Sequence, residues 1–284
     1  MKLEDAVEAH RLLGSGTVTG KLLLTPKDKQ RESVMNKIDL NDRHAIVTGG
    51  AKGIGRSIAA RALASGARVS IWDIDAERTA QTIGELKACD CVRSDAVDVT
   101  SPKAITQGLA DAVDAFGNVD ILVNNAGAVG TLAMTWEQPV ENWQRMLTLN
   151  LTSAFLCCRT VAPHMMANGY GRIVNMASNA GKMGTPNNGP YAAAKAGVIS
   201  LTKTLAKECA GSGVIVNAVA PGGTNTELFD DLSDEYRNQI TSAMPIARLI
   251  EPDEVAALAV WAASQDCAAT TGFVFDISGG RADY

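Results

Sequence analysis

The stretch HAIVTGGAKGIG at residues 44–55 decides the expected fold of this chain. A short apolar run ends there in a glycine turn, and the amphipathic segment RSIAARALASG follows at residues 56–66. A strand, a tight turn and a helix N-terminus form a site for a pyrophosphate, because free N–H groups and the helix dipole favour negative charge. The spacing is G-x-x-x-G-x-G, through Gly49, Gly53 and Gly55, not G-x-G-x-x-G. Alone it would suit an ordinary turn; between a strand and a helix it predicts a nucleotide site.

A carboxylate follows the second predicted strand. Residues 68–73 read RVSIWD, so Asp73 falls at the C-terminal end of that strand. A carboxylate at this place can bind both ribose hydroxyls of an adenosine and would repel a 2′-phosphate. The sequence therefore predicts NAD(H) in preference to NADP(H). Lys52 in the glycine turn could meet a 2′-phosphate, which leaves NADP possible.

Strand and helix patterns alternate from residue 44 onward. After a third strand before Asp98, apolar runs occupy residues 120–123 (DILV), 172–177 (RIVNMA), 214–219 (VIVNAV) and 273–277 (FVFDI). This alternation predicts an α/β fold with a parallel sheet and helical crossovers. Residues 1–37 lack this pattern and end in a polar stretch, so they are predicted to be an N-terminal extension and linker, and residues 38–284 a catalytic domain.

Residues 178–195, SNAGKMGTPNNGPYAAAK, hold side chains suited to proton transfer. Tyr191 and Lys195 share one face of a helix that Pro190 is suited to begin. A lysine ammonium beside a tyrosine favours the phenolate, so we expect it to draw the tyrosine pKa down from about 10. Ser178 would add a hydrogen bond to a substrate oxygen. The Tyr–Lys pair alone would also suit ordinary helix-surface neighbours, so its meaning depends on the rest of the chain.

Other polar residues stand in otherwise apolar surroundings. Residues 98–100 (DVT) and 124–127 (NNAG) each follow a strand. Adjacent asparagines there either tie neighbouring loops together or contact an adenine and its ribose. Asn150 lies inside residues 143–155, WQRMLTLNLTSAF, which we expect to form a largely buried helix where an asparagine needs a partner. Residues 227–250 are polar and acidic, and are predicted to form a substrate lid.

Composition narrows the partners. The chain has 284 residues, 5% of them aromatic, and its formal net charge of −5 gives no reason to expect nucleic acid or an acidic membrane surface as a partner. No apolar run approaches the roughly 20 residues that span a bilayer, and no signal peptide is apparent, so a cytoplasmic location is predicted. The six cysteines form no CxxC motif, so no metal is predicted, and Cys157-Cys158 is expected in the core.

Together these motifs resemble the short-chain dehydrogenase/reductase family, in the family's order, over roughly residues 40–284. The matching motifs are TGGAKGIG, Asp73, Asp98, NNAG, Asn150, Ser178, YAAAK and PGG. The resemblance implies a single doubly wound Rossmann domain with a seven-stranded parallel sheet, assembled as a homotetramer or a homodimer. It also implies hydride transfer between a nicotinamide cofactor and a CH–OH group of a small-molecule substrate.

The resemblance also implies roles for individual residues. Tyr191 would be the general acid-base, Ser178 would polarise the substrate oxygen, and Lys195 would lower the tyrosine pKa and hold the nicotinamide ribose. Asn150 would anchor a water that links Lys195 to solvent. The implied cofactor-binding residues are Gly49, Lys52, Gly53, Ile54, Gly55, Asp73, Asp98, Val99, Asn125, Ala126, Gly127, Tyr191, Lys195, Pro221, Gly222, Thr224 and Thr226.

The substrate is less constrained. Asn179, Asn187 and Asn188 indicate a small polar substrate such as a polyol, a sugar or a sugar acid, although they would also suit surface loops. The alternative is a 3-oxoacyl thioester reductase that uses NADPH. Asp73 and the net negative charge of the chain argue against this alternative. A catalytically silent nucleotide sensor is the other alternative, but such proteins usually lose the tyrosine or the lysine. Residues 276–284, DISGGRADY, are a candidate to reach a neighbouring subunit's pocket.

Overall fold

The computed structural model describes residues 10–12, 14–15, 38–87, 90–227 and 234–282. By its internal contacts the chain divides into two units, Met1–Lys37 and Ile38–Tyr284. The linker expected at residues 27–37 lies outside the described residues. The site and all the elements below belong to the second unit.

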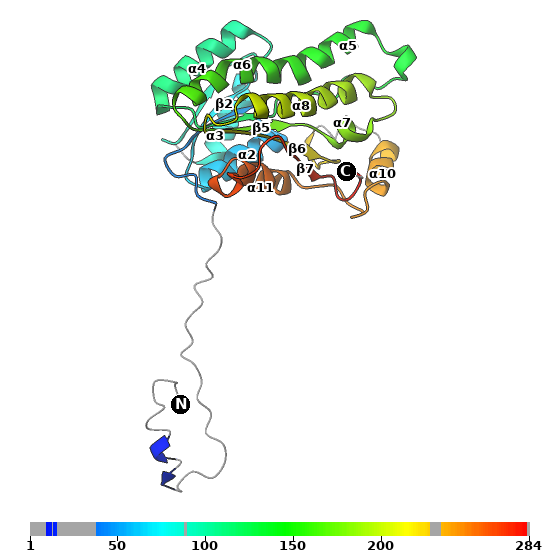
Figure 1. The fold of residues 1–284 in the computed structure, drawn as a ribbon. Coiled ribbons are helices and arrows are strands. Elements are labelled where there is room, and N and C mark those ends of the chain that lie inside the picture. The colour runs from blue at the N-terminus through cyan, green and yellow to red at the C-terminus, as the bar shows by residue number, and fades with distance from the viewer. Residues whose placement is uncertain (1–9, 13, 16–37, 88–89, 228–233, 283–284) are drawn as a thin grey trace. The chain divides into compact units, whose positions relative to one another are not determined.

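The second unit is built on a seven-stranded sheet in which every neighbouring pair is parallel. Its order is β3-β2-β1-β4-β5-β6-β7, and Figure 1 shows the strands between layers of helices. The strands are β1 (His44–Thr48), β2 (Arg68–Trp72), β3 (Val92–Asp95), β4 (Ile121–Asn124), β5 (Gly171–Met176), β6 (Val214–Pro221) and β7 (Val274–Ile277). The expected α/β, doubly wound seven-stranded fold is confirmed. Strand order reverses between β1 and β4, and ligands of such sheets bind at this switch point, beyond the carboxyl ends of the strands.

Helices cover both faces of the sheet. In Figure 1, α2 and α11 lie below the sheet and α4, α5, α6 and α8 lie above it. The helices are α2 (Gly53–Ala64), α3 (Ala76–Leu86), α4 (Pro102–Phe116), α5 (Val140–Leu147), α6 (Ser153–Ala167), α7 (Asn179–Met183), α8 (Gly189–Glu208), α10 (Asp234–Ser242) and α11 (Pro252–Ala262). Short 3₁₀ turns occupy Thr135–Glu137 and Gln265–Cys267, and a π-helical turn, η3, occupies Thr148–Thr152.

Two apolar clusters fill the layers between helices and sheet. One joins α2, α3 and α11 to side chains such as Val47 and Ile71, and the other joins α4, α6 and α8 to Ile46 and Ile173. The alternating residues of β1 thus enter opposite clusters, which explains why strands buried on both faces read as continuous apolar runs. The expected core position of Cys157 and Cys158 is confirmed, since their exposed fractions are 1% and 2%. No helix within the described residues is long and apolar enough to cross a membrane.

The expected largely buried helix at residues 143–155 is helical, but the expectation of burial is wrong at its ends. Trp143 is 41% exposed and Phe155 is 45% exposed, whereas Met146 and Asn150 are buried. The segment runs through α5, η3 and α6 and buries one stripe only, as an amphipathic surface helix does. Its π turn places Asn150 on the inner side, beside the site described next.

Candidate active site

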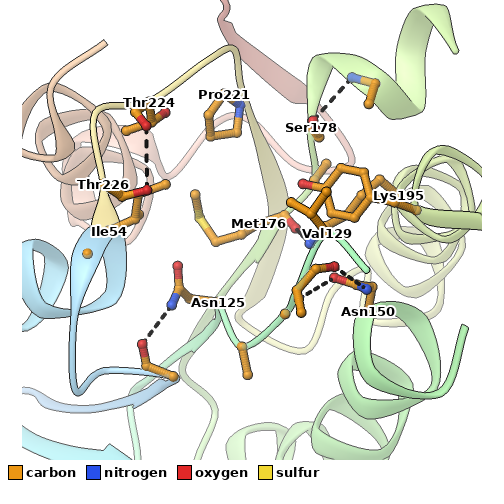
Figure 2. A pocket seen from close by; sticks show the side chains of 18 of the residues that line it. Ile54, Asn125, Val129, Asn150, Met176, Ser178, Lys195, Pro221, Thr224 and Thr226 are labelled. Carbon is orange, nitrogen blue, oxygen red and sulfur yellow. Dashed lines mark hydrogen bonds between the residues drawn. The ribbon is translucent and has the colours of Figure 1, made fainter. Parts of the chain in front are cut away.

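A cavity of about 670 Å³ lies where the strands end, and it gathers nearly all of the residues predicted for the site. Figure 2 shows part of its lining, with side chains from several crossovers converging on one space. The predicted residues that line it are Gly49, Lys52, Gly53, Ile54, Asp73, Asp98, Val99, Asn125, Ala126, Gly127, Asn150, Ser178, Tyr191, Lys195, Pro221, Gly222, Thr224 and Thr226. Gly55 is the single predicted residue that does not line the cavity.

Gly55 contributes instead to the packing of the glycine turn. A Cβ atom there would lie 2.1 Å from the carbonyl oxygen of Gly49 and 2.5 Å from Nδ2 of Asn125. The predicted direct cofactor contact of Gly55 therefore finds no support in the lining of the cavity, and its backbone serves close approach of helix and turn. Gly49 and Gly53 do line the cavity, with φ of +62° and +55°, a region that glycine enters without strain.

The N-terminus of α2 is open towards the cavity. Its N-cap residue, Lys52, makes no side-chain cap, and the first turn contains no acidic residue. The first backbone N–H groups of a helix have no partner within the helix, so they remain available to an anion. Because Gly53 and Ile54 of this turn also line the cavity, the residues present fit the pyrophosphate of a dinucleotide.

Asp73 lies at the end of β2 and is fixed by backbone donors. Its Oδ2 accepts a 3.0 Å hydrogen bond from the N–H of Ala51, and its Oδ1 accepts one of 3.0 Å from the N–H of Asp75. The carboxylate thereby ties the glycine turn to β2 and still faces the cavity. Lys52 is the residue that left NADP possible. Its Nζ lies 3.9 Å from the carboxylate of Glu227, so its ammonium already has an acidic neighbour.

The two asparagines after β4 have different tasks. Asn125 donates through Nδ2 to the carbonyls of Thr48 and Gly49, both at 3.0 Å, which joins the end of β4 to the glycine turn (Figure 2). Asn124 is buried and donates to Oδ1 of Asn175 at 2.8 Å. Of the two roles left open for this pair, tying loops together is the one the structure shows, while Asn125 and Ala126 also line the cavity.

Ser178, Tyr191 and Lys195 meet at the opposite end of the cavity from Asp73 and Asp98. Ser178 caps α7, accepting a 3.1 Å hydrogen bond from the N–H of Ala180. Tyr191 and Lys195 come from the first turns of α8, and Lys195 donates a 2.7 Å hydrogen bond from Nζ to the carbonyl of Met176 (Figure 2). The end of β5 and the start of α8 thus bring a hydroxyl, a phenol and an ammonium to one place.

Burial shifts two pKa values at this site. It raises the pKa of Tyr191, and a hydrogen bond with Ser178 opposes the rise. Burial lowers the pKa of Lys195 to about 8. The expectation that Lys195 draws the tyrosine pKa below 10 is therefore wrong for this structure. The physical reason is that desolvation disfavours the phenolate and the ammonium alike, and the Lys195 proton donor is engaged by a carbonyl.

Asn150 is buried in the π turn and finds its partners in the loop after β4. Its Nδ2 donates to the carbonyls of Ala128 at 2.9 Å and Met146 at 3.1 Å, and its Oδ1 accepts from the N–H of Ala128 at 3.2 Å (Figure 2). A Cβ atom on Gly127 would lie 2.5 Å from this Oδ1. The buried asparagine is thus a satisfied core residue that also lines the cavity, and it holds the wall of the site beside Lys195.

Several lining residues were absent from the predicted site. Five of them come from the expected lid and from the C-terminal tail: Glu227, Gln239, Ile240, Ala243 and Arg281. Part of the expected lid, residues 228–233, lies outside the described residues. The structure places Arg281 of the tail at the cavity of its own chain, and the expected reach of the tail to a neighbouring subunit's pocket stays a prediction. Its position shortly after β7, at the carboxyl edge of the sheet, is the signal that could have indicated this.

Comparison with known proteins identifies the family. A model of the short chain dehydrogenase family matches residues 43–237. The chain belongs to the short-chain dehydrogenase family. It is 44% identical over 242 residues to a 2-dehydro-3-deoxy-L-rhamnonate dehydrogenase (NAD(+)) of Sphingomonas sp. (strain SKA58), a match that covers 85% of this chain and 96% of the relative. It is 40% identical over 244 residues to a 3-oxoacyl-[acyl-carrier-protein] reductase of Vibrio cholerae, covering 86% of this chain and 98% of the relative.

Solved structures show the same short-chain dehydrogenase architecture. A protein of Agrobacterium tumefaciens, provisionally assigned as a gluconate dehydrogenase, matches with a TM-score of 0.82 and 34% identity, covering 87% of this chain and 98% of that protein. A variant of actinorhodin polyketide ketoreductase with NADPH matches with a TM-score of 0.80 and 36% identity, covering 85% of this chain and 98% of that protein. This short-chain dehydrogenase is therefore an oxidoreductase of CH–OH groups that uses a nicotinamide nucleotide.

Proposed function

We propose that this short-chain dehydrogenase interconverts a secondary alcohol and a ketone on a sugar acid or a similar small polar substrate, with NAD(H) as cofactor. The observation that carries the proposal is one continuous cavity that joins Ser178, Tyr191 and Lys195 to the carboxylate of Asp73. Proton-transfer groups lie at one end of this cavity and a ribose-binding carboxylate at the other. A dinucleotide bound between them supplies or accepts the hydride.

Tyr191 carries the proton in this proposal. Its hydroxyl donates a proton to the substrate oxygen when a ketone is reduced, and its phenolate accepts the proton when an alcohol is oxidised. Ser178 holds the same substrate oxygen, because its hydroxyl is positioned as the cap of α7 and lines the same cavity as Tyr191. A hydrogen bond to that oxygen strengthens as negative charge develops on it. The raised pKa of Tyr191 favours its neutral phenol, which is the form that donates a proton to a ketone.

Lys195 and Asn150 support the proton donor. Lys195 presents its ammonium beside the ring of Tyr191 while the Met176 carbonyl fixes Nζ. Since its pKa is about 8, most of the lysine is protonated at pH 7, and it can stabilise the phenolate that forms during turnover. Asn150 holds the loop after β4 in the shape that leaves this end of the cavity open. In the bound state Lys195 would also hold the nicotinamide ribose.

Cofactor preference follows from the charges at the adenosine end. Asp73 presents a carboxylate that two ribose hydroxyls can meet and a 2′-phosphate cannot approach without repulsion. Lys52 and Arg78 are the nearby bases, and both pair with Glu227, at 3.9 Å and 2.7 Å. NAD(H) is therefore the proposed cofactor. The 2-dehydro-3-deoxy-L-rhamnonate dehydrogenase relative carries NAD(+) in its name.

The proposed substrate class is supported by the polar wall of the cavity and by that relative. Asn179 and Asn188 line the cavity and are 8% and 6% exposed, so both amides need polar partners. A hydroxylated acid supplies such partners. The 40% identical 3-oxoacyl-[acyl-carrier-protein] reductase favours the alternative, a thioester reductase that uses NADPH. Asp73 argues against the alternative, because its charge opposes NADPH.

A substrate panel tests the proposal. Nicotinamide absorbance would be followed with NAD and NADP against 2-dehydro-3-deoxy-L-rhamnonate, D-gluconate, D-glucitol and a 3-hydroxyacyl thioester. Turnover of an acid with NAD at a kcat/KM above that of the thioester with NADP is the expected result. Higher kcat/KM for the 3-hydroxyacyl thioester with NADP would establish the alternative. NADH binding without turnover of any compound would favour the nucleotide sensor.

The proposal extends to assembly and location. We place the enzyme in the cytoplasm as a homotetramer or a homodimer. Trp136, in the turn before α5, is 81% exposed, and Val140 of α5 is 75% exposed; with Trp143 and Phe155 they are exposed apolar side chains in and beside α5 and α6 that a second copy could cover. Light scattering after size exclusion would test it, and a monomeric mass across the working concentration range would contradict it.

A further inference from the structure

The C-terminal tail after β7 is folded onto the site by its own hydrogen bonds. Oδ1 of Asp276 accepts from the hydroxyl and the N–H of Ser278, at 2.7 and 2.9 Å. The Ser278 hydroxyl in turn accepts from the N–H of Ala282 at 3.0 Å. Ser278 is fully buried, so this turn is an integral part of the domain. Arg281 lies within it and lines the cavity.

Two anchors and one close backbone approach place this turn at the end of the cavity where Ser178 lies. Asp276 forms a 3.0 Å ion pair with Lys182 of α7, the helix that Ser178 caps. The N–H of Gly222 donates to the carbonyl of Ile277 at 3.0 Å, and a Cβ atom on Gly222 would lie 2.9 Å from the carbonyl of Ser278. The tail therefore adjoins the catalytic end, whereas Asp73 and Asp98 mark the adenosine end.

Arg281 differs from the other cations that line the cavity. Lys52 faces Glu227 at 3.9 Å, and Lys195 donates to the Met176 carbonyl. Among the described residues, the guanidinium of Arg281 has neither a hydrogen bond nor an ion pair, and the side chain is only partly exposed. A guanidinium offers several N–H donors in a planar fork that matches a carboxylate. Held at the catalytic end of the cavity, this fork is available to an anionic substrate.

A second polar group beside the site also lacks a partner. Asn188 is 6% exposed and lines the cavity, and within the part of the chain that the structure describes its buried Oδ1 has no hydrogen-bond donor. An unsatisfied buried acceptor costs free energy, so a ligand that donates a hydroxyl proton gains by meeting it. The cavity thus offers an unpaired cation and an unpaired acceptor, which a hydroxy acid can satisfy at once.

We propose that Arg281 binds the carboxylate of the substrate and sets the preference for acids over neutral polyols. The inference rests on the proposed function, which it deepens by naming the residue that recognises the acid group. Arg281 acts here in binding and takes no part in proton or hydride transfer. A sugar acid would then be held at its carboxylate by Arg281 and at its reacting oxygen by Ser178 and Tyr191.

The test compares Arg281→Gln and Arg281→Lys with wild type on D-gluconate, 2-dehydro-3-deoxy-L-rhamnonate and the neutral D-glucitol. In Arg281→Gln we expect kcat/KM for the acids to fall about 10- to 100-fold, mostly through KM, with D-glucitol turnover unchanged. Arg281→Lys keeps the positive charge but loses the planar fork of donors. Its kcat/KM for the acids should therefore lie between those of wild type and Arg281→Gln. Arg248→Gln is the matched control, because Arg248 pairs with Glu254 away from the cavity.

Two further measurements separate the possible failures. The Kd of NADH is expected to be equal in wild type and Arg281→Gln. Weaker NADH binding with an unchanged KM for acids would assign Arg281 to the cofactor and overturn the inference.

If wild type oxidises D-glucitol but neither acid, the proposed substrate class fails. Inhibition by D-gluconate then decides on Arg281, since equal inhibition of wild type and Arg281→Gln would overturn its role. Equal acid kinetics in both proteins would also overturn it and leave the proposed function standing.

Discussion

Nζ of Lys195 lies 5.7 Å from the centre of the Tyr191 ring. The same nitrogen donates a 2.7 Å hydrogen bond to the carbonyl of Met176, at the end of β5. Backbone geometry therefore fixes the ammonium beside the phenol, and a flexible surface pairing is excluded in this structure. This arrangement buries the Lys195 ammonium, and the burial lowers the pKa of Lys195 to about 8.

That burial predicts how stability depends on pH. The folded pKa of Lys195 lies below its unfolded value of about 10.5, so between about pH 8 and 10.5 the unfolded chain binds more protons than the folded chain. This group therefore adds stability as the pH rises through that window. In Lys195→Met the contribution is lost, and the free energy of unfolding of wild type relative to the variant should rise by about 2 kcal/mol from pH 7 to pH 10. Urea unfolding at a series of pH values measures it.

The control for this slope is Lys203→Met, which changes an exposed lysine of the same helix. Lys203→Met should keep the wild-type dependence on pH. A difference between wild type and Lys195→Met that stays constant with pH would contradict the lowered pKa of Lys195.

Removal of the Tyr191 hydroxyl should abolish turnover while the cofactor still binds. A positioned general acid-base contributes about 10²- to 10⁴-fold, so kcat of Tyr191→Phe should fall by at least about 10²-fold. NADH titration by fluorescence should give a Kd near that of wild type. Tyr170→Phe serves as control, because the Tyr170 ring packs between Arg43 and Arg172 and does not line the cavity. Retained activity in Tyr191→Phe would remove the tyrosine from the mechanism.

Cofactor preference should follow the charge of residue 73. Asp73→Ser keeps a small acceptor for the N–H of Ala51 and removes the repulsion of a 2′-phosphate. We expect the ratio of kcat/KM for NAD to that for NADP to fall at least about tenfold, a change of about 1.4 kcal/mol. Asp75→Ser changes the neighbouring carboxylate and keeps a residue able to cap α3. If both variants preserve the wild-type ratio, the ribose contact lies elsewhere.

Alanine should have opposite effects at two glycines, Gly55 beside the glycine turn and Gly84 on α3. Gly55→Ala would drive a Cβ atom into the Gly49 carbonyl, so it should destabilise the fold by about 1–3 kcal/mol and weaken NADH binding. Gly84→Ala, in the middle of exposed α3 surface, meets no atom within 4 Å and should stabilise by about 0.5–1 kcal/mol. Thermal unfolding with and without NADH compares them, and a neutral Gly55→Ala would argue against close packing at this turn.

Deletion of residues 1–37 should leave folding and activity intact. The family model matches from residue 43 onward, and the matches to two relatives cover 85% and 86% of this chain and 96% and 98% of the relatives. We expect Tm and kcat/KM of the shortened protein to equal those of the full chain. An insoluble or inactive product would show that the extension is needed by the catalytic unit.

Local chemistry made much of this molecule predictable. The apolar run before Gly49 and the period that brings Tyr191 and Lys195 to one helix face are both properties of short stretches, and the structure places each as expected. Asp73 could be placed because a residue that ends a parallel strand must lie at the carboxyl edge of the sheet.

What could not be predicted from the sequence depends on long-range packing. The pKa of Tyr191 depends on how deeply α8 is buried, which no spacing of residues reveals. Gly55 could be assigned to the turn, but whether it faces a ligand or the Gly49 carbonyl depends on the angle of α2. Arg281 could not be assigned to its own cavity, because the direction of a tail depends on an ion pair between residues 94 positions apart, Lys182 and Asp276.

The anchored tail after β7 makes the two termini unequal for protein engineering. A purification handle or a reporter domain fused behind residue 284 would pull on the turn that holds Arg281 and, through Asp276, on the helix that Ser178 caps. A fusion ahead of residue 38 adds to a part of the chain outside the catalytic unit. Assays of this enzyme, immobilisation on a surface and coupling to a second enzyme should therefore all use the N-terminal end.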